Sequence, residues 1–251
     1  MRCLADLRGI FDRAEIIYRR ANRVVLRWRE AESGHSIILK MWSHQDWRGR
    51  LRRLLRIAAC DHEWRSLTRL DRAGMAVPRP LGTCRIAPSI AGYTEVLFME
   101  DLGQCEDANQ YLKRLIQTGR DQQALRFEDA LIEMTQRLLD AGMLDVDHGL
   151  VNIMVQTSGR PVRLDVEFAR LVVWPRLFAG MYGQMLGCMI GLHAFAVQPD
   201  TDRTTRFAQR LCVRLRPPRR ALDRAGIHVR EMLQFQLQNS AIDTRLVLPW
   251  E

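Results

Sequence analysis

The chain has 251 residues, of which 47% are apolar and 27% charged, enough for a substantial hydrophobic core in one two-lobed domain or two small domains. Six scattered cysteines include no Cys-x-x-Cys pair and the histidines have no ligand spacing, so we expect reduced thiols, no disulfide framework and no zinc site. The net charge of +9 suits anionic partners, but without interleaved aromatics or a groove-reading motif we expect no nucleic-acid partner.

Almost all of the basic residues are arginines. Of the 38 lysines and arginines, only Lys40 and Lys113 are lysines, a skew that genome composition explains most simply. A lysine that persists in such a background is a candidate for a site that requires a compact ammonium group. Lys113 is interpreted as chance retention, whereas Lys40 lies in an apolar segment of a predicted sheet.

The N-terminal part of the chain predicts an antiparallel sheet. Apolar and β-branched residues gather in three segments, with a Ser33-Gly34 turn signal before the third: 16–18, 24–28 and 37–42. A further strand is predicted over 95–99, followed by a short linker at 100–103. Residues 1–13 are charged and lack the apolar stretch of a secretory signal, which predicts a cytoplasmic location.

Two helices are predicted between the third and fourth strands. Residues 45–58 have a helical period and carry arginines that share much of one face. This face is either simply solvated or attracted to a phosphate-rich substrate or to an anionic surface, such as the inner face of the cytoplasmic membrane. The second helix, 61–70, ends at Gly74, which suits a helix C-terminus.

The C-terminal part predicts mainly helices. These cover 106–118 and 122–142, and basic helices broken by Pro217-Pro218 reach to 240. Between them, 177–198 contains no Lys, Arg, Asp or Glu and is long enough for a membrane span. Its glutamines, histidine and four glycines favour instead a central helix that is buried all round.

Residues 144–168 predict a loop, a strand, a tight turn and a second strand. Asp147 and Asn152 are five residues apart and precede the first apolar run, and Asp165 lies in the second run. This order brings the three polar side chains to one end of a hairpin. An aspartate that orients a hydroxyl, with an Asn and an Asp that hold magnesium on a nucleotide, is the arrangement that phosphoryl transfer requires.

Lys40 and Glu63 support the same chemistry from the N-terminal part. Lys40 near the end of the third strand can place a cation on nucleotide phosphates, and Glu63, 23 residues further on, can hold that lysine in position. Taken alone, Glu63 is better interpreted as an ordinary solvated helix acid. The order of all five residues along the chain makes the functional interpretation the stronger one.

Three segments match known motifs: the helix Glu63–Leu70 with Gly74 and Pro78 after it, the segment Met99–Gly103, and Asp147-x4-Asn152 before Asp165-Val166-Glu167. Together, over about residues 15–170, they resemble the bacterial lipopolysaccharide-core kinases of the Kdo/WaaP type, within the protein-kinase-like superfamily.

The resemblance implies a role for each matching residue. Lys40 would bind the phosphates of ATP, and Glu63 would anchor Lys40. Asp147 would be the catalytic base or would orient the acceptor hydroxyl, while Asn152 and Asp165 would bind Mg²⁺. Backbone groups of the hinge would meet the adenine: Met99, Glu100, Asp101 and Leu102.

The chain departs from the family pattern at three places. The hairpin expected to cover the phosphates has no glycine, and its Arg19, Arg20 and Arg23 either supply charge instead or form a solvated basic turn. Asp145 stands where a histidine usually braces the loop, so it either braces through another partner or acts as a second acid near the metals. Glu167 stands where a glycine is usual, as a further metal ligand or as a structural hydrogen-bond partner.

His148 follows the proposed catalytic acid directly. It is interpreted as a loop residue that hydrogen-bonds the backbone, because a positioned aspartate suffices where orientation and charge neutralisation dominate the chemistry.

The predicted fold class is α+β. One protein-kinase-like domain over 1–251 would comprise a β-rich N-lobe at about 10–99, a hinge at 100–103 and a compact helical C-lobe at 104–251.

The chain after Asp165 is short and lacks an Ala-Pro-Glu segment, which favours a sugar or glycolipid acceptor over a protein. The predicted reaction moves the γ-phosphate of ATP, with Mg²⁺, to a hydroxyl of the lipopolysaccharide core or a related glycolipid. A compact atypical Ser/Thr protein kinase and a non-catalytic pseudokinase stay open as alternatives.

Overall fold

A computed structural model describes residues 7–20, 22–30, 32, 34–43, 59–237 and 246–250. The chain divides into two compact units, one made of residues up to Asp71 with Val77–Gly103, and one made of Arg72–Ala76 with the chain from Gln104 onward. The basic helix expected over 45–58 lies outside the described residues.

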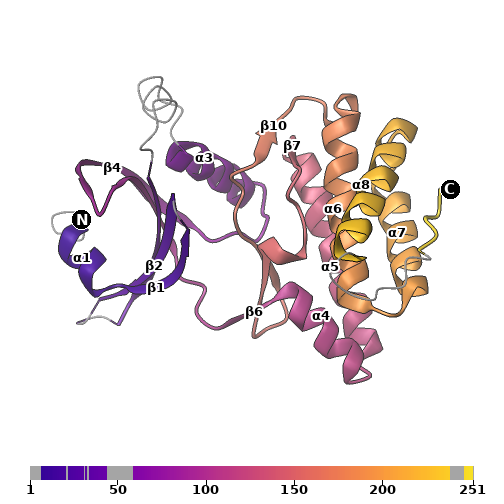
Figure 1. Cartoon of the computed structure of the whole chain (residues 1–251), viewed down its shortest axis with the longest axis horizontal. Coiled ribbons are helices and arrows are strands. Elements are labelled where there is room, and N and C mark those ends of the chain that lie inside the picture. Colours follow the sequence, from indigo (N-terminus) through magenta and orange to yellow (C-terminus); the bar gives the residue numbers. More distant parts are fainter. Residues whose placement is uncertain are drawn as a thin grey trace. The chain divides into compact units, whose positions relative to one another are not determined.

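The first unit is built on a five-stranded antiparallel sheet with the strand order β1-β2-β3-β5-β4 (Figure 1). The strands are β1 Glu15–Arg20, β2 Arg23–Arg29, β3 Ser36–Trp42, β4 Pro80–Ile90 and β5 Tyr93–Glu100. All of the predicted N-terminal strands fall within these, so the β-rich part of the prediction is confirmed. Two helices complete the unit, α1 Leu7–Arg13, which was not predicted, and α3 Ala59–Arg72.

The register assigns each side chain to one of the two sheet faces, because residues that pair directly across antiparallel strands share a face. Two neighbouring rows of paired residues therefore lie on opposite faces of the sheet. One row contains Val24, Met41 and Val96, and the other contains Val25, Lys40 and Leu97. The first row is buried in a core that Ile10 of α1 joins. Lys40 therefore projects from the face opposite to this core.

The second unit is mainly helical. Its helices are α4 Ala108–Gln117, α5 Asp121–Asp140, α6 Ala179–Val197, α7 Thr201–Leu215 and α8 Arg219–Leu237. Short strands form a sheet of order β6-β8-β9 and a pair β7-β10: β6 Cys105–Asp107, β7 Met143–Asp145, β8 Ile153–Gln156, β9 Pro161–Arg163 and β10 Ala169–Leu171. A sheet in the first unit and helices in the second confirm the α+β fold class.

One predicted helix boundary is wrong. Residues 105–107 form β6, and Asp107 is the N-cap of α4 because its carboxylate accepts hydrogen bonds from the N–H groups of Asn109 and Gln110, at 2.9 and 3.1 Å. A carboxylate at this position satisfies N–H groups that the first helical turn leaves without partners.

Helix α6 is buried along most of its length. Of its 19 residues 13 are buried, on all sides of the helix, so the prediction of a central buried helix over 177–198 is confirmed. In the described part of the chain, no helix combines the length and apolar character that crossing a membrane requires.

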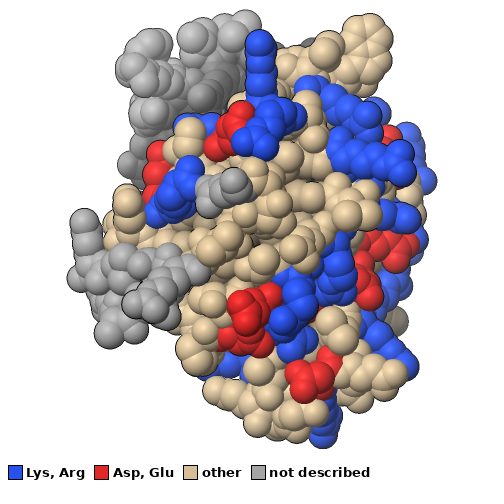
Figure 2. Space-filling model, turned by 90° about the vertical axis from the view of Figure 1, so that its right-hand side faces the viewer, with Lys and Arg blue, Asp and Glu red and all other residues tan. Residues whose placement is uncertain are grey.

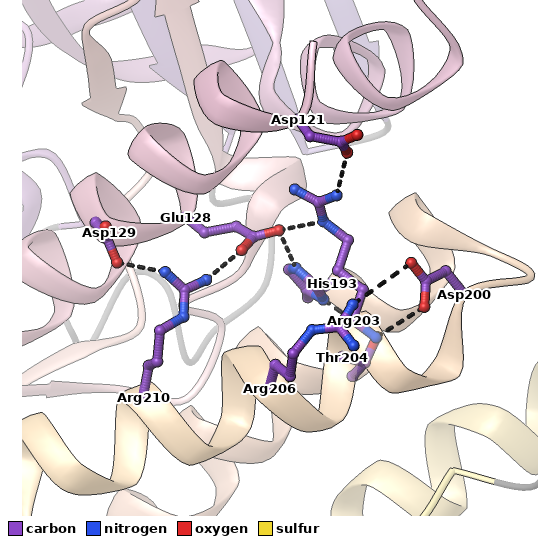
Figure 3. A network of polar contacts seen from close by, with 9 residues as sticks. All are labelled: Asp121, Glu128, Asp129, His193, Asp200, Arg203, Thr204, Arg206 and Arg210. Carbon is purple, nitrogen blue, oxygen red and sulfur yellow. Dashed lines mark hydrogen bonds and ion pairs between the residues drawn. The ribbon is translucent and has the colours of Figure 1, made fainter. Parts of the chain in front are cut away.

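Charged side chains attach α7 to α5 and α6 (Figure 3). The buried carboxylate of Glu128 accepts a hydrogen bond from Nε of Arg203 at 2.6 Å, pairs with Arg210, and lies 3.3 Å from Nε2 of His193. The outer ends of both arginines pair with exposed acids of α5: Asp121 and Asp129. Because a buried carboxylate without partners is costly, this network fixes the three helices relative to one another.

Helices α6 and α8 approach closely at glycines of α6. A Cβ atom on Gly183 would lie 2.4 Å from the carbonyl oxygen of Ala221, and one on Gly187 would lie 2.9 Å from that of Ala225. Gly180, one turn before Gly183, has no such neighbour within 4 Å. Close packing of α8 therefore depends on the two inner glycines.

We predict that Gly183→Ala lowers the free energy of unfolding by about 1–3 kcal/mol, because the new methyl group meets backbone that cannot move aside. Gly180→Ala is the matched control and should be neutral or stabilising by up to about 1 kcal/mol, since alanine favours the helix and meets open space. Urea unfolding of both variants measures the difference, and equal stabilities would contradict the packing described.

Candidate active site

In the first unit, the structure brings Lys40 and Glu63 together. Nζ of Lys40 lies 2.9 Å from Oε1 and 2.7 Å from Oε2 of Glu63, and the two residues are only 4% and 1% exposed. Glu63 lies on the buried stripe of α3 with Leu67 and Leu70, so the interpretation as a solvated helix acid is wrong. The ammonium group also lies 5.2 Å from the ring centre of Trp42. A charged lysine is thus held in a fixed position on the sheet.

The register divides the arginines of the β1–β2 hairpin between the two faces. Tyr18 belongs to the row of Lys40, and Arg20 and Arg23 pair two positions further along the same face. Their guanidinium groups each lie 5.7 Å from the ring centre of Tyr18. Arg19 belongs to the row of the core face. Of the three predicted phosphate-binding arginines, only Arg20 and Arg23 share the face of Lys40.

The segment expected to meet the adenine is continuous with the sheet. Met99 and Glu100 belong to β5, so the strand extends one residue into the predicted linker. The N–H group of Glu100 donates to the carbonyl oxygen of Arg79 at 3.0 Å. Leu102 follows in a half-buried position.

Asp101 has a structural function that the sequence did not indicate. Its side chain accepts hydrogen bonds from the N–H group of Gly103 at 3.0 Å and from Nε of Arg27 at 2.9 Å. Burial alone would raise the pKa of Asp101, but hydrogen bonds from Ser36 and Gly103 and the charge of Arg27 outweigh it and lower the pKa. The carboxylate thereby fixes the backbone of the segment after β5.

In the second unit, the predicted hairpin is confirmed. Asn152 ends a short 3₁₀ turn, η2 Leu150–Asn152, directly before β8, and Asp165 follows β9 by two residues. Ile153 pairs with Arg163 across the hairpin. The two proposed metal ligands therefore flank the same end of the two strands.

A buried ion pair braces the loop that carries Asp147. Nη2 of Arg163 lies 2.5 Å from Oδ2 of Asp145, and both side chains are fully buried. The other oxygen of Asp145 accepts the N–H group of Asp147 at 3.1 Å. Arg163 also donates to the carbonyl oxygens of Asn152 and Asp147, at 2.9 and 3.2 Å. Of the two interpretations of Asp145, the structure favours bracing through another partner.

Asp147 and Asn152 are joined directly. Nδ2 of Asn152 donates to Oδ2 of Asp147 at 2.8 Å and to its carbonyl oxygen at 2.9 Å. Within the described residues no donor reaches the amide oxygen of Asn152, so a group that magnesium accepts as a ligand remains available. Burial raises the pKa of the Asp147 carboxyl, opposed by the hydrogen bond from Asn152 and the charge of Arg163.

Asp165 and Glu167 place two carboxylates close together. Both are half-buried, and their oxygens lie within 4.8 Å of each other. Asp165 has a φ of 42°, in the left-handed region that non-glycine residues seldom adopt. Two close carboxylates are oxygen donors of the kind that a hard divalent cation prefers.

His148 is buried; its N–H group donates to the carbonyl oxygen of Asp145 at 3.1 Å, whereas its ring bonds to a side chain. Its Nε2 lies 3.0 Å from the hydroxyl of Thr135, and that hydroxyl donates to the carbonyl oxygen of Leu131 at 2.9 Å. The hydroxyl therefore accepts from Nε2–H, which assigns the neutral Nε2 tautomer. Burial, with the charge of Arg163, lowers the pKa of His148 well below its ordinary value. A neutral, enclosed imidazole anchors the loop to α5.

Gly149 allows the loop to rest on α6. A Cβ atom at this position would lie 2.2 Å from Cδ1 of Leu192 and 3.0 Å from Sγ of Cys188. The backbone of Gly149 is extended, so the requirement for glycine comes from packing. No local pattern predicted this contact or the bond from His148 to Thr135. The position of Arg163 between apolar residues of a short strand was a signal that a buried acid would need to pair with it.

Comparison with known proteins agrees with this geometry. The family model described as the lipopolysaccharide kinase (Kdo/WaaP) family matches residues 13–170. A solved structure described as "WaaP in complex with acyl carrier protein" matches with a TM-score of 0.62 and 17% identity, over 92% of this chain and 90% of that chain. A search of the curated proteins found no match. The structural match confirms the predicted kinase-like fold.

We predict that Arg163→Met lowers the free energy of unfolding by about 3–5 kcal/mol, because it leaves the buried carboxylate of Asp145 without a counter-charge. Adding Asp145→Asn should recover part of this loss, since no buried charge then remains. Arg160→Met, at an exposed position of the same hairpin, should change stability by no more than about 0.5 kcal/mol. Urea unfolding measures all three, and a double variant less stable than Arg163→Met would contradict the ion-pair account.

A buried neutral His148 also predicts a pH dependence of stability. The unfolded chain takes up a proton near the ordinary histidine pKa while the folded chain does not, so stability falls as the pH falls. Between about pH 7.5 and about pH 5.5 the loss is about 1.4 kcal/mol for each such histidine. His148→Gln should therefore reduce the acid-induced loss by about 1.4 kcal/mol. His35→Gln, at an exposed position, should leave it unchanged, and identical pH profiles for the two variants would count against a buried neutral His148.

Proposed function

The chain belongs to the lipopolysaccharide kinase (Kdo/WaaP) family and is a phosphotransferase, and from this premise we propose that it transfers the γ-phosphate of ATP, with Mg²⁺, to a sugar hydroxyl of the lipopolysaccharide core or a related glycolipid. Family membership implies the use of ATP. The observation that carries the proposal is the bond between Asp147 and Asn152, which holds one carboxylate and one amide oxygen in a braced loop.

Asp147 is the proposed catalytic residue. Its carboxylate would orient the acceptor hydroxyl and accept its proton as the oxygen–phosphorus bond forms. A pKa raised by burial makes this carboxylate a stronger base than an ordinary aspartate. The hydrogen bond from Asn152 fixes the direction of the carboxylate, so little reorientation is needed at the moment of transfer.

Asn152 and Asp165 are the proposed Mg²⁺ ligands, with Glu167 as a third oxygen donor. The amide oxygen of Asn152 has no donor within the described chain, and the two carboxylates lie within 4.8 Å of each other. Held by these residues, Mg²⁺ would neutralise charge on the ATP phosphates. The positions of these three side chains would determine where the positive charge of the cation lies.

Lys40 is proposed to bind the ATP phosphates, with Glu63 as its positioning residue. Because both carboxylate oxygens of Glu63 hold the amino group of the lysine, its side chain keeps one direction. Arg20 and Arg23 share its face and are proposed to supply the charge that backbone amides supply in a glycine-rich loop.

We further propose that segment 100–103 is the hinge of a single two-lobed domain, and that backbone groups from Met99 to Leu102 bind the adenine.

The acceptor and the location are proposed from the family. A sugar hydroxyl of a glycolipid at the inner face of the cytoplasmic membrane is consistent with a chain of net charge +9. WaaP was solved in a complex with acyl carrier protein, and the proposal for this chain does not depend on such a partner.

We predict that the purified protein phosphorylates core-oligosaccharide acceptors with Mg-ATP, and that Asp147→Asn lowers kcat/KM by about 10²–10⁴-fold because proton transfer and orientation are lost. Lys40→Met and Asp165→Ala should remove turnover to a similar extent. Glu133→Gln, which removes an exposed carboxylate from α5, is the control and should keep full activity. Phosphate incorporation and circular dichroism of each variant are the measurements.

The outcomes separate the alternatives. Turnover on proteins but not on sugars would support an atypical protein kinase. Neither nucleotide binding nor turnover in the wild-type protein would contradict catalysis and support a pseudokinase.

A further inference from the structure

The segment between Asp165 and α6 exposes large apolar side chains at an unusual density. Six of the eleven residues of 168–178 are large exposed hydrophobic residues: Phe168, Leu171, Val173, Trp174, Leu177 and Phe178. Val173 is 82% exposed and Leu177 72%. Single exposed hydrophobic residues are ordinary, but a continuous group of this size indicates a binding surface.

The backbone of this segment is ordered by hydrogen bonds, so the exposed side chains are held in place. Strand β10 pairs with β7, and the N–H group of Val172 donates to the carbonyl oxygen of Gly142 at 2.7 Å. A short 3₁₀ turn, η3 Pro175–Leu177, follows, closed by bonds from Leu177 and Phe178 to the carbonyl oxygens of Trp174 and Pro175, at 3.0 and 3.1 Å. Val172 is buried and anchors the middle of the segment.

Positive charge accompanies the apolar side chains. The segment contains Arg170 and Arg176 and no acidic residue. Both arginines are exposed, and neither forms an ion pair with any residue in the described ranges. Their charge is therefore available to an anionic partner.

The apolar surface continues beside the segment. Trp174 and Leu177 line a cavity of about 460 Å³ together with Leu139, Tyr182 and Leu215. A neighbouring cavity of about 640 Å³ shares Gln136 with the first and is lined by three arginines of the α7 end: Arg210, Arg214 and Arg216. Figure 2 shows that Lys and Arg side chains on this face lie among Asp and Glu side chains.

We propose that segment 168–178 docks on an anionic lipid bilayer. Its Trp, Phe and Leu side chains would enter the boundary between headgroups and acyl chains, and Arg170 and Arg176 would meet the phosphate headgroups. Apolar side chains beside unpaired arginines are the combination that interfacial binding requires. Tryptophan and arginine in particular are amphipathic and suit this boundary.

The position of the segment indicates what docking on the bilayer would achieve. It begins three residues after Asp165, and Ala169 of β10 pairs with Asp145, the residue that braces the loop of Asp147. A lipid-linked acceptor in the same bilayer would thus be delivered beside the proposed catalytic residue. This delivery rests on the proposed function, whereas binding to the bilayer does not.

The test is co-sedimentation with vesicles of phosphatidylglycerol and phosphatidylcholine, and with vesicles of phosphatidylcholine alone. Wild-type protein should bind the anionic vesicles and bind the neutral ones more weakly. The variant L171S/W174S/L177S should bind anionic vesicles at least about tenfold more weakly, because three apolar anchors are lost. The matched control L125S/I227S removes exposed apolar side chains from α5 and α8 and should bind as the wild type does.

A second variant tests the charge without altering apolar packing. R170Q/R176Q should lose most of the preference for anionic over neutral vesicles. Blue-shifted tryptophan fluorescence on vesicle addition, lost in W174F, locates the contact in the segment. Wild-type protein that binds no vesicles, or a triple variant and an arginine variant that both bind like the wild type, would overturn the proposal, and in the first case a protein partner would be the occupant to seek.

Asp165→Ala separates this inference from the proposed function. It should abolish turnover and leave vesicle binding intact, whereas L171S/W174S/L177S should keep turnover on a water-soluble core oligosaccharide and lose it on a vesicle-embedded acceptor. Vesicle binding by a wild-type protein without kinase activity would refute the proposed function alone. Equal turnover of the triple variant on both acceptors would refute the delivery of acceptor by the segment.

Discussion

A buried charge needs a partner, and the pairing of Asp145 with Arg163 determines how the centre of the second unit is built. Both side chains are fully buried and 2.5 Å apart, so each makes the presence of the other tolerable. Through the remaining donors of Arg163 and the second oxygen of Asp145, the pair also fixes the backbone at Asp147 and Asn152. One ion pair thus joins β7, the loop and β9, and everything at the tip of the hairpin is positioned relative to it.

Buried carboxylates hold basic side chains in other parts of the molecule as well. Glu63 holds Lys40 in the first unit, and Glu128 holds Arg203 and Arg210 in the second. In each case a buried carboxylate serves as the fixed point, and a flexible basic side chain is ordered by it. The buried acids thus determine the local geometry around these basic side chains.

Much of this was readable from the sequence, for identifiable reasons. Apolar segments of period two marked the strands of the first unit, and the order of Lys40, Glu63, Asp147, Asn152 and Asp165 predicted that the last three meet at a hairpin. What escaped prediction depends on contacts between distant segments. The packing of Gly149 against Leu192 and the bond from His148 to Thr135 have no local signature, because each is created only when the loop packs against α6 and α5. The register that separates Arg19 from Arg20 and Arg23 was not predictable, because the turn residues alone do not fix it.

The scarcity of lysine has a practical consequence for chemical labelling. Lys113 is exposed on α4, whereas Lys40 is enclosed with Glu63, and the chain has no other lysine. Amine-reactive reagents and lysine-specific proteases therefore have one accessible side-chain target in the folded protein. Acylation of Lys40 becomes a direct reporter of local opening around β3 and α3, with Lys113 as an internal standard on the same chain.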